Sequence, residues 1–243
     1  MPAGKDKGGL FKFKQFDVDQ SGCAMKINTD GVLLGALADA DDPKNILDIG
    51  TGTGVIAVML AQRFPKAKID AVEIDVSAAA TAGRNFANSP FASRLAAYSL
   101  GFEQFFESHP EKKYDLIVSN PPFYINSLKS PKKSIEIAKH ADKDFFERLI
   151  IAVAGHLTNA GRLCMILPVD TAELVLEHGQ RNRLFPLNSV NISSFSNSEP
   201  HRVILSLGFD QATTTESALS IFETPGVYSE EYIKLLKPYF IIF

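Results

Sequence analysis

The sequence predicts an α/β fold with a mostly parallel sheet of seven strands and a C-terminal antiparallel hairpin. From residue 45 onward, short apolar runs alternate with helical segments in the order β-α-β-α-β-β-α-β, and parallel strands need such crossover connections. Two strand-like runs near the end flank a polar turn at residues 196–200, which indicates the hairpin. We expect an N-terminal extension over residues 1–40 and a main domain over residues 41–243.

The composition is that of an ordinary globular protein. The 243 residues are 45% hydrophobic and 22% charged, which excludes the disordered, collagen-like and disulfide-scaffold classes. The net charge of −3 argues against a general nucleic-acid coat protein but permits a local basic patch. No apolar run approaches the roughly 20 residues of a membrane helix, and the start lacks a signal peptide. We therefore expect a cytoplasmic protein with no membrane partner, a monomer by default, with Cys23 and Cys164 as reduced thiols.

The N-terminal extension carries two structural signals. Apolar and polar residues alternate over Phe11–Phe16, a pattern typical of a half-exposed strand. Thr29 and Asp30 then open an apolar run that ends near Ala38. We expect a helix over this run, with one of these two residues as its N-cap.

In the main domain, short apolar runs predict strands, and Ala-rich or amphipathic segments predict helices. The expected strands are residues 46–49, 68–73, 95–99, 114–119, 162–167, 187–195 and 202–209. The expected helices are residues 55–64, 76–87, 144–157, 171–181 and 229–236. The tail over residues 211–216 is polar and gives no strand signal.

A glycine-rich turn, Asp48-Ile49-Gly50-Thr51-Gly52-Thr53-Gly54, joins the first of these strands to the helix that follows. Glycines let the backbone turn sharply and approach a ligand closely, and the helix N-terminus adds unpaired N–H groups. The glycines alternate as G-x-G-x-G, whereas the dinucleotide fingerprint is G-x-G-x-x-G. The alternative is a tight turn that serves packing alone.

Glu73 ends the second strand, about 20 residues beyond the turn, the separation at which a carboxylate meets a ribose. Its two oxygens can accept hydrogen bonds from the ribose diol. The alternative is a helix-capping acid, a role for which Asp75 is already placed. We expect Glu73 to bind a nucleoside ribose.

The segment Asn120-Pro121-Pro122-Phe123 follows the strand at residues 114–119, at the edge where open α/β sheets place their sites. Asn120 Oδ1 and the Pro121 carbonyl can each accept one hydrogen of a planar exocyclic NH2 group. Phe123 can stack on the same flat group. The motif therefore predicts a site that holds an aromatic amine or an amide.

Together, the glycine turn and Asn-Pro-Pro-Phe resemble class I S-adenosylmethionine-dependent methyltransferases that modify amino groups. A closer resemblance lies in the N-terminal segments Lys14-Gln15-Phe16, Cys23-Ala24-Met25-Lys26-Ile27 and Thr29–Gly35, with Gln20 between them. These resemble the bacterial family of tRNA (adenine-N6) methyltransferases that act on position 37 of a valine tRNA. The resemblance covers nearly the whole chain and implies a Rossmann-like fold.

The resemblance also implies residue roles. S-adenosylmethionine would meet Asp48, Gly50, Thr51, Gly52, Gly54 and Glu73, with Lys26 and Thr29 in a cap formed by the N-terminal extension over its methionine end. The catalytic group would be Asn120, Pro121, Pro122 and Phe123. The contact to the cofactor's adenine stays open between Ser99, Phe102 and Glu103.

The partner implied is tRNA, and lysines after the catalytic motif offer a surface for it. Lys129, Lys132 and Lys133 fall in an expected loop over residues 124–143, whose alternative role is a solvated loop. The five histidines show no metal spacing, so we expect no metal. Other functions stay open as hypotheses: methylation of rRNA guanine N2 or of protein glutamine, and RNA binding by a catalytically silent protein. A nicotinamide oxidoreductase fits the glycine spacing least.

Overall fold

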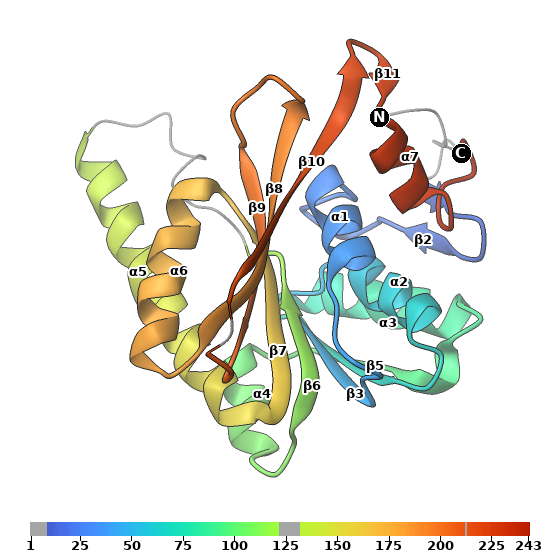
Figure 1. Cartoon of the computed structure of the whole chain (residues 1–243). Coiled ribbons are helices and arrows are strands. Elements are labelled where there is room, and N and C mark those ends of the chain that lie inside the picture. Colours follow the sequence, from blue (N-terminus) through green and yellow to red (C-terminus); the bar gives the residue numbers. More distant parts are fainter. Residues whose placement is uncertain (1–8, 122–131, 212) are drawn as a thin grey trace.

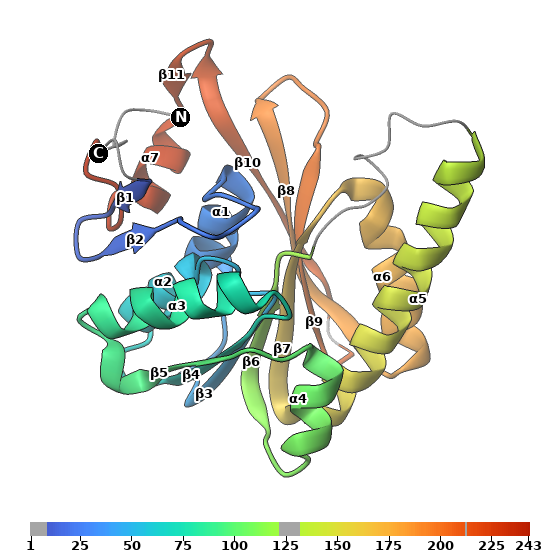
Figure 2. The same ribbon diagram turned by 180° about the vertical axis from the view of Figure 1, so that it is seen from behind.

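The structure is a computed structural model that describes residues 9–121, 132–211 and 213–243, with the backbone alone over residues 132–142. A nine-stranded sheet runs through the molecule, and helices cover both of its faces (Figures 1 and 2). The predicted α/β architecture is confirmed. None of the helices in the described ranges is long and apolar enough to cross a membrane.

The sheet contains the seven expected strands and two more at one edge. In spatial order it consists of β11 (Val227–Tyr228), β10 (Thr215–Thr224), β8 (Phe185–Phe195), β9 (Arg202–Gly208), β7 (Leu157–Leu167), β6 (Tyr114–Ser119), β3 (Asn45–Ile49), β4 (Lys68–Val72) and β5 (Leu95–Tyr98). In the spatial run β7, β6, β3, β4, β5, each strand is parallel to the next. Strand β9 is antiparallel to both β7 and β8, which confirms the predicted hairpin.

The helices divide between the two faces. They are α1 (Thr29–Leu37), α2 (Val55–Arg63), α3 (Val76–Asn88), α4 (Phe102–Ser108), α5 (Lys132–His156), α6 (Val169–Arg181) and α7 (Glu230–Leu236), with a short 3-10 turn at Ala92–Arg94. Helices α1, α2, α3 and α7 share one hydrophobic cluster with the sheet, and α4, α5 and α6 share a second. Both faces of the sheet are covered, so Ile46 joins the first cluster while its neighbour Leu47 joins the second.

Several details differ from the sequence expectations. Helix α4 was not expected, because its seven residues are too few to show helical periodicity. Helix α5 begins at Lys132, not at residue 144, so the expected loop over residues 124–143 is wrong beyond residue 131. Strand β10 starts inside the polar tail and buries only Leu219 and Ile221. The N-cap of α1 is Asn28, whose Oδ1 accepts the Gly31 N–H at 2.9 Å.

The N-terminal extension packs against the end of the chain. In place of one strand over residues 11–16, β1 (Leu10–Lys12) and β2 (Asp17–Asp19) form an antiparallel pair beside α7 (Figure 2). Lys14 Nζ donates to the carbonyls of Lys237 and Phe243, at 2.6 and 2.7 Å. Phe13 and Phe16 belong to the same hydrophobic cluster as α2 and α3, so the extension shares the core of the main domain.

The turn between β3 and α2 brings helix α2 close to α3. Gly54 stands at the N-cap of α2 with φ of 82°, a left-handed conformation that favours glycine. A Cβ at this position would lie 2.5 Å from Phe86 Cε1 of α3. Gly54 therefore serves the backbone turn and the helix contact together.

We expect Gly54→Ala to destabilise the fold by about 2–4 kcal/mol, because it combines a left-handed alanine with a steric clash. Gly226→Ala is the matched control, since Gly226 has φ of 86° and no atom within 4 Å of its Cβ position. It should lose only about 1 kcal/mol. Urea unfolding of both variants measures the difference, and equal losses would mean that the Phe86 contact costs nothing.

Candidate active site

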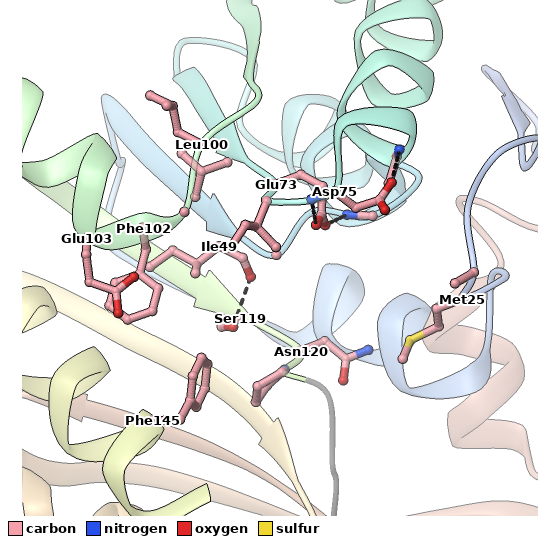
Figure 3. A pocket seen from close by; sticks show the side chains of 18 of the residues that line it. Met25, Ile49, Glu73, Asp75, Leu100, Phe102, Glu103, Ser119, Asn120 and Phe145 are labelled. Carbon is pink, nitrogen blue, oxygen red and sulfur yellow. Dashed lines mark hydrogen bonds between the residues drawn. The ribbon is translucent and has the colours of Figure 1, made fainter. Parts of the chain in front are cut away.

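A cavity of about 490 Å³ opens at the carboxyl ends of β3, β4 and β6 (Figure 3). Its volume lies in the range of small-ligand sites. The residues of the predicted site that line it are Gly50, Gly52, Glu73, Asn120 and Pro121. Parallel strands end at the same edge of a sheet, and this brings three segments far apart in sequence around one space.

Glu73 connects the glycine turn to the loop before α3. Its Oε2 accepts the Gly52 N–H at 2.9 Å, and its Oε1 accepts the Asp75 N–H at 3.0 Å. Each carboxylate oxygen has a second lone pair, so Glu73 can still accept a hydrogen bond from a ligand. Asp75 caps α3 by accepting the Ala78 N–H at 2.8 Å, which confirms its expected capping role.

The glycines of the turn leave room for a ligand on the cavity side. Gly50 and Gly52 have φ of 73° and 56°, and no atom lies within 4 Å of either Cβ position. The backbone can therefore approach a bound molecule closely. Gly54 and Thr51 do not line the cavity, because Gly54 faces Phe86 and Thr51 turns toward Asp48.

Asp48 is fully buried at the end of β3 and is not among the lining residues. Its Oδ2 accepts the Thr51 hydroxyl hydrogen at 2.6 Å, whereas Oδ1 has no hydrogen-bond partner among the described residues. Burial raises the pKa of Asp48 to about 7, although the hydrogen bond from Thr51 lowers it. The carboxyl group therefore fixes the turn and keeps one unpaired oxygen beneath it.

Asn120 follows β6 directly, and its side chain extends toward the part of the cavity where Met25 lies (Figure 3). The end of β6 is tied to β3 because Ser119 Oγ donates to the Ile49 carbonyl at 2.9 Å. Pro121 lines the same wall. Pro122 and Phe123, the remaining members of the predicted catalytic group, lie outside the described residues.

The N-terminal extension contributes one wall, through residues that sequence reasoning did not select. Cys23, Ala24 and Met25 line the cavity, whereas Lys26 and Thr29 do not. Lys26 is exposed, and its Nζ donates to the Gln20 carbonyl. The Gln20 side chain accepts the Ile27 N–H at 2.9 Å and thereby holds the segment in place.

The far end of the cavity is mostly apolar. It is lined by Ile74, Leu100, Gly101, Phe102, Glu103, Phe145 and Arg148. Phe102 and Phe145 meet edge to face at 5.9 Å, and Arg148 Nε donates to Glu103 Oε1 at 3.2 Å. Of the three open candidates for the adenine contact, Phe102 and Glu103 are here and Ser99 is not. Phe145 and Arg148 share a helix face, but no sequence signal shows which face of α5 meets the cavity.

The candidate RNA-binding lysines lie at or beyond the limit of the described residues. Lys132 and Lys133 are the first two residues of α5, where the backbone alone is described, and Lys129 lies outside. Within the described ranges, no three His, Cys, Asp or Glu side chains gather as metal ligands.

The raised pKa of Asp48 predicts a pH dependence of stability. An unfolded Asp ionises near pH 4, whereas Asp48 in the fold keeps its proton until about pH 7. Between these values the folded state binds more protons, so stability falls as the pH rises, by about 2–4 kcal/mol from this group. Asp48→Asn should remove this slope. Urea unfolding of both proteins at pH 4.5, 6 and 8 measures it, and a pH-independent difference would mean that Asp48 is ionised in the fold throughout.

The comparisons with known proteins agree with this geometry. The model of the methyltransferase small domain family matches residues 25–172. A tRNA1(Val) (adenine(37)-N6)-methyltransferase of Pedobacter heparinus is 47% identical over 233 residues, covering 96% of this chain and 98% of that protein. A protein of the same name from Bacteroides thetaiotaomicron is 38% identical over 233 residues, covering 96% of this chain and 97% of that protein.

Solved structures show the same fold at low sequence identity. A predicted O-methyltransferase from Agrobacterium tumefaciens matches with a TM-score of 0.69 at 18% identity, over 86% of this chain and 96% of that one. A precorrin-6y C5,15-methyltransferase from Geobacter metallireducens matches with a TM-score of 0.52 at 16% identity, over 78% of this chain and 92% of that one. The predicted Rossmann-like class I methyltransferase fold is thus confirmed. The chain belongs to the methyltransferase small domain family and, within it, to the family of tRNA1(Val) (adenine(37)-N6)-methyltransferases.

Proposed function

We propose that this protein transfers a methyl group from S-adenosylmethionine to the exocyclic N6 of an adenine in tRNA, at position 37 of a valine tRNA. The observation that carries the proposal is that Asn120 and Pro121 share one cavity with Gly50, Gly52 and Glu73. A site for an amino group and a site for a nucleoside cofactor therefore adjoin. The relatives' names supply the substrate.

The residues present fit the cofactor. Glu73 lines the cavity and can accept from the ribose hydroxyls, and the open side of Gly50 and Gly52 can take the methionine part. The buried Asp48 carboxyl holds the turn through Thr51 and does not itself line the cavity. At the apolar end, Ile74 and Leu100 can pack on the adenine ring, and the Glu103 carboxylate can accept from its amino group. Lys26 and Thr29 stay as predicted parts of the cap.

In the proposed reaction, the chain's main task is to position the acceptor nitrogen. When bound, S-adenosylmethionine supplies an electrophilic methyl group on a positively charged sulfur. Asn120 Oδ1 and the Pro121 carbonyl each accept one N–H of the adenine amino group, which fixes the nitrogen toward the cavity. Phe123 stacks on the base, which must leave its place in the anticodon loop to reach the pocket. A strong base is not required, because a neutral amine needs to lose its proton only after methylation, and alignment accounts for much of the rate.

Similarity to known enzymes, and not the two acceptor oxygens, favours tRNA over the other acceptors. Guanine N2 and protein glutamine carry planar NH2 groups that the same two oxygens can hold, so Asn120 and Pro121 alone do not choose among them. The near full-length similarity to the tRNA enzymes includes the N-terminal extension and favours tRNA. The intact Glu73 and Asn120 favour a catalyst over a silent RNA-binding protein.

Asn120→Ala should lower kcat by about 10²–10³-fold, the loss typical of removing one positioned polar group. Affinity for S-adenosylmethionine should stay within about twofold, because Glu73 and the glycine turn are untouched. The measurement is methyl transfer to tRNA, with the product identified by nucleoside mass spectrometry, beside calorimetry with the cofactor. Asn88→Ala, an exposed amide in the last turn of α3, is the control. Turnover equal to wild type would refute the role of Asn120.

Replacing Lys132 and Lys133 by Glu should weaken tRNA binding. It should also make the slope of log affinity against log salt concentration shallower, by the equivalent of about one to two phosphate contacts. The control is the same reversal at Lys66 and Lys68, which are exposed near the amino end of β4, away from the cavity. Binding is measured by titration at 50 to 300 mM salt, roughly the range over which phosphate contacts weaken most. If both double variants bind alike, α5 does not contact RNA through these lysines.

A further inference from the structure

The first turn of α1 lies beside the proposed catalytic amide. A Cβ on Gly31 would stand 3.9 Å from Asn120 Nδ2 and 3.8 Å from Val55 Cγ1. Between the helix backbone and the Asn120 amide there is thus a gap that a methyl group would fill in ordinary van der Waals contact. The position of this turn sets the width of that gap and so the space beside Asn120.

An ion pair ties this turn to strand β9 of the sheet. Asp30, in the first turn of α1, accepts from Arg202 Nε at 2.8 Å. Arg202 is the first residue of β9, and its Nη1 also donates to the His201 carbonyl at 2.9 Å. The Asp30 and Arg202 side chains are only 20% and 25% exposed, so water screens the pair less than a surface pair.

Arg202 lies in β9, on the opposite side of β6 from β3 and β4. In the sheet, β7 and β9 follow β6 in one direction, while β3 and β4, whose ends carry the cavity, follow it in the other. Neither Asp30 nor Arg202 lines the cavity. If the cofactor fills the cavity, the acceptor base must reach Asn120 from another side, and α1 borders that approach.

We propose that Asp30 and Arg202 are a positioning pair for methyl transfer. By fixing the first turn of α1, the pair sets the space in which the Asn120 amide meets the acceptor nitrogen. This inference rests on the proposed function. A misplacement of about 1 Å at a reacting group can cost on the order of 10²-fold in rate, so the pair can matter for turnover without touching the substrate.

The test compares two ion pairs of matched burial. Lys112 Nζ meets Asp70 Oδ2 at 2.7 Å with side-chain exposures of 28% and 20%, beyond the residues that line the cavity. We expect Arg202→Gln and Lys112→Gln to lower the urea midpoint alike. Arg202→Gln should lower kcat for tRNA methylation by about 10–100-fold with cofactor affinity within about twofold, and Lys112→Gln should leave kcat unchanged.

Further variants separate positioning from a structural role. Asp30→Asn should lower kcat as Arg202→Gln does, and the double variant should be little worse than either, because the Asp30–Arg202 ion pair is already lost in each single variant. Arg202→Lys, which keeps the charge, should recover part of the rate. The proposal is overturned if folded Arg202→Gln or Asp30→Asn turns over within about twofold of wild type. It is also overturned if cofactor affinity falls in step with kcat, because the first turn of α1 would then form part of the cofactor-binding site. A wild-type protein that does not methylate tRNA would instead refute the proposed function.

Discussion

One carboxylate, that of Glu73, joins the two loops on which the cavity depends. It accepts an amide hydrogen from the turn after β3 and another from the loop after β4, so the residues that precede α2 and α3 are held at a fixed separation. Both helices begin at this edge, and their first amides have no partners within the helix. The Ser119 hydrogen bond to Ile49 adds the end of β6 to the same frame. The site therefore follows from the parallel topology.

Residues at strand ends were predictable because their position depends on sheet topology alone. Gly50, Gly52, Glu73 and Asn120 follow or end clear apolar strands, and all four line the cavity. The third glycine shows a limit of this reasoning. Gly54 belongs to the same motif, yet it faces Phe86 and not the cavity, because the turn must also bring α2 against α3. A motif in sequence therefore combines residues that meet a ligand with residues that only shape the loop.

Features that depend on tertiary contacts were not predictable. Asn28, Thr29 and Asp30 are three consecutive good cap residues, and only the structure shows that Asn28 caps α1 while Asp30 pairs with Arg202, far along the chain. Strand β10 has two buried side chains, so its hydrophobic signal is weak, and pairing with β8 forms it. The apolar end of the cavity needs Phe145 and Arg148 from α5, whose inward face is set by packing on β6 and β7.

The placement of charge in the cavity bears on which atom receives the methyl group. Cys23 lines the cavity, and burial raises the pKa of its thiol. A thiolate there would compete with the amine for an electrophilic carbon, because the thiolate is the nucleophilic form of cysteine. A protonated thiol removes that competitor at neutral pH. Near Asn120 the protein then offers an amide, a carbonyl and the Met25 thioether, all neutral, whereas Glu103 lies at the far end (Figure 3). There Glu103 pairs with Arg148. In the proposed reaction, these neutral groups can hold an amine but do not compete with it as nucleophiles.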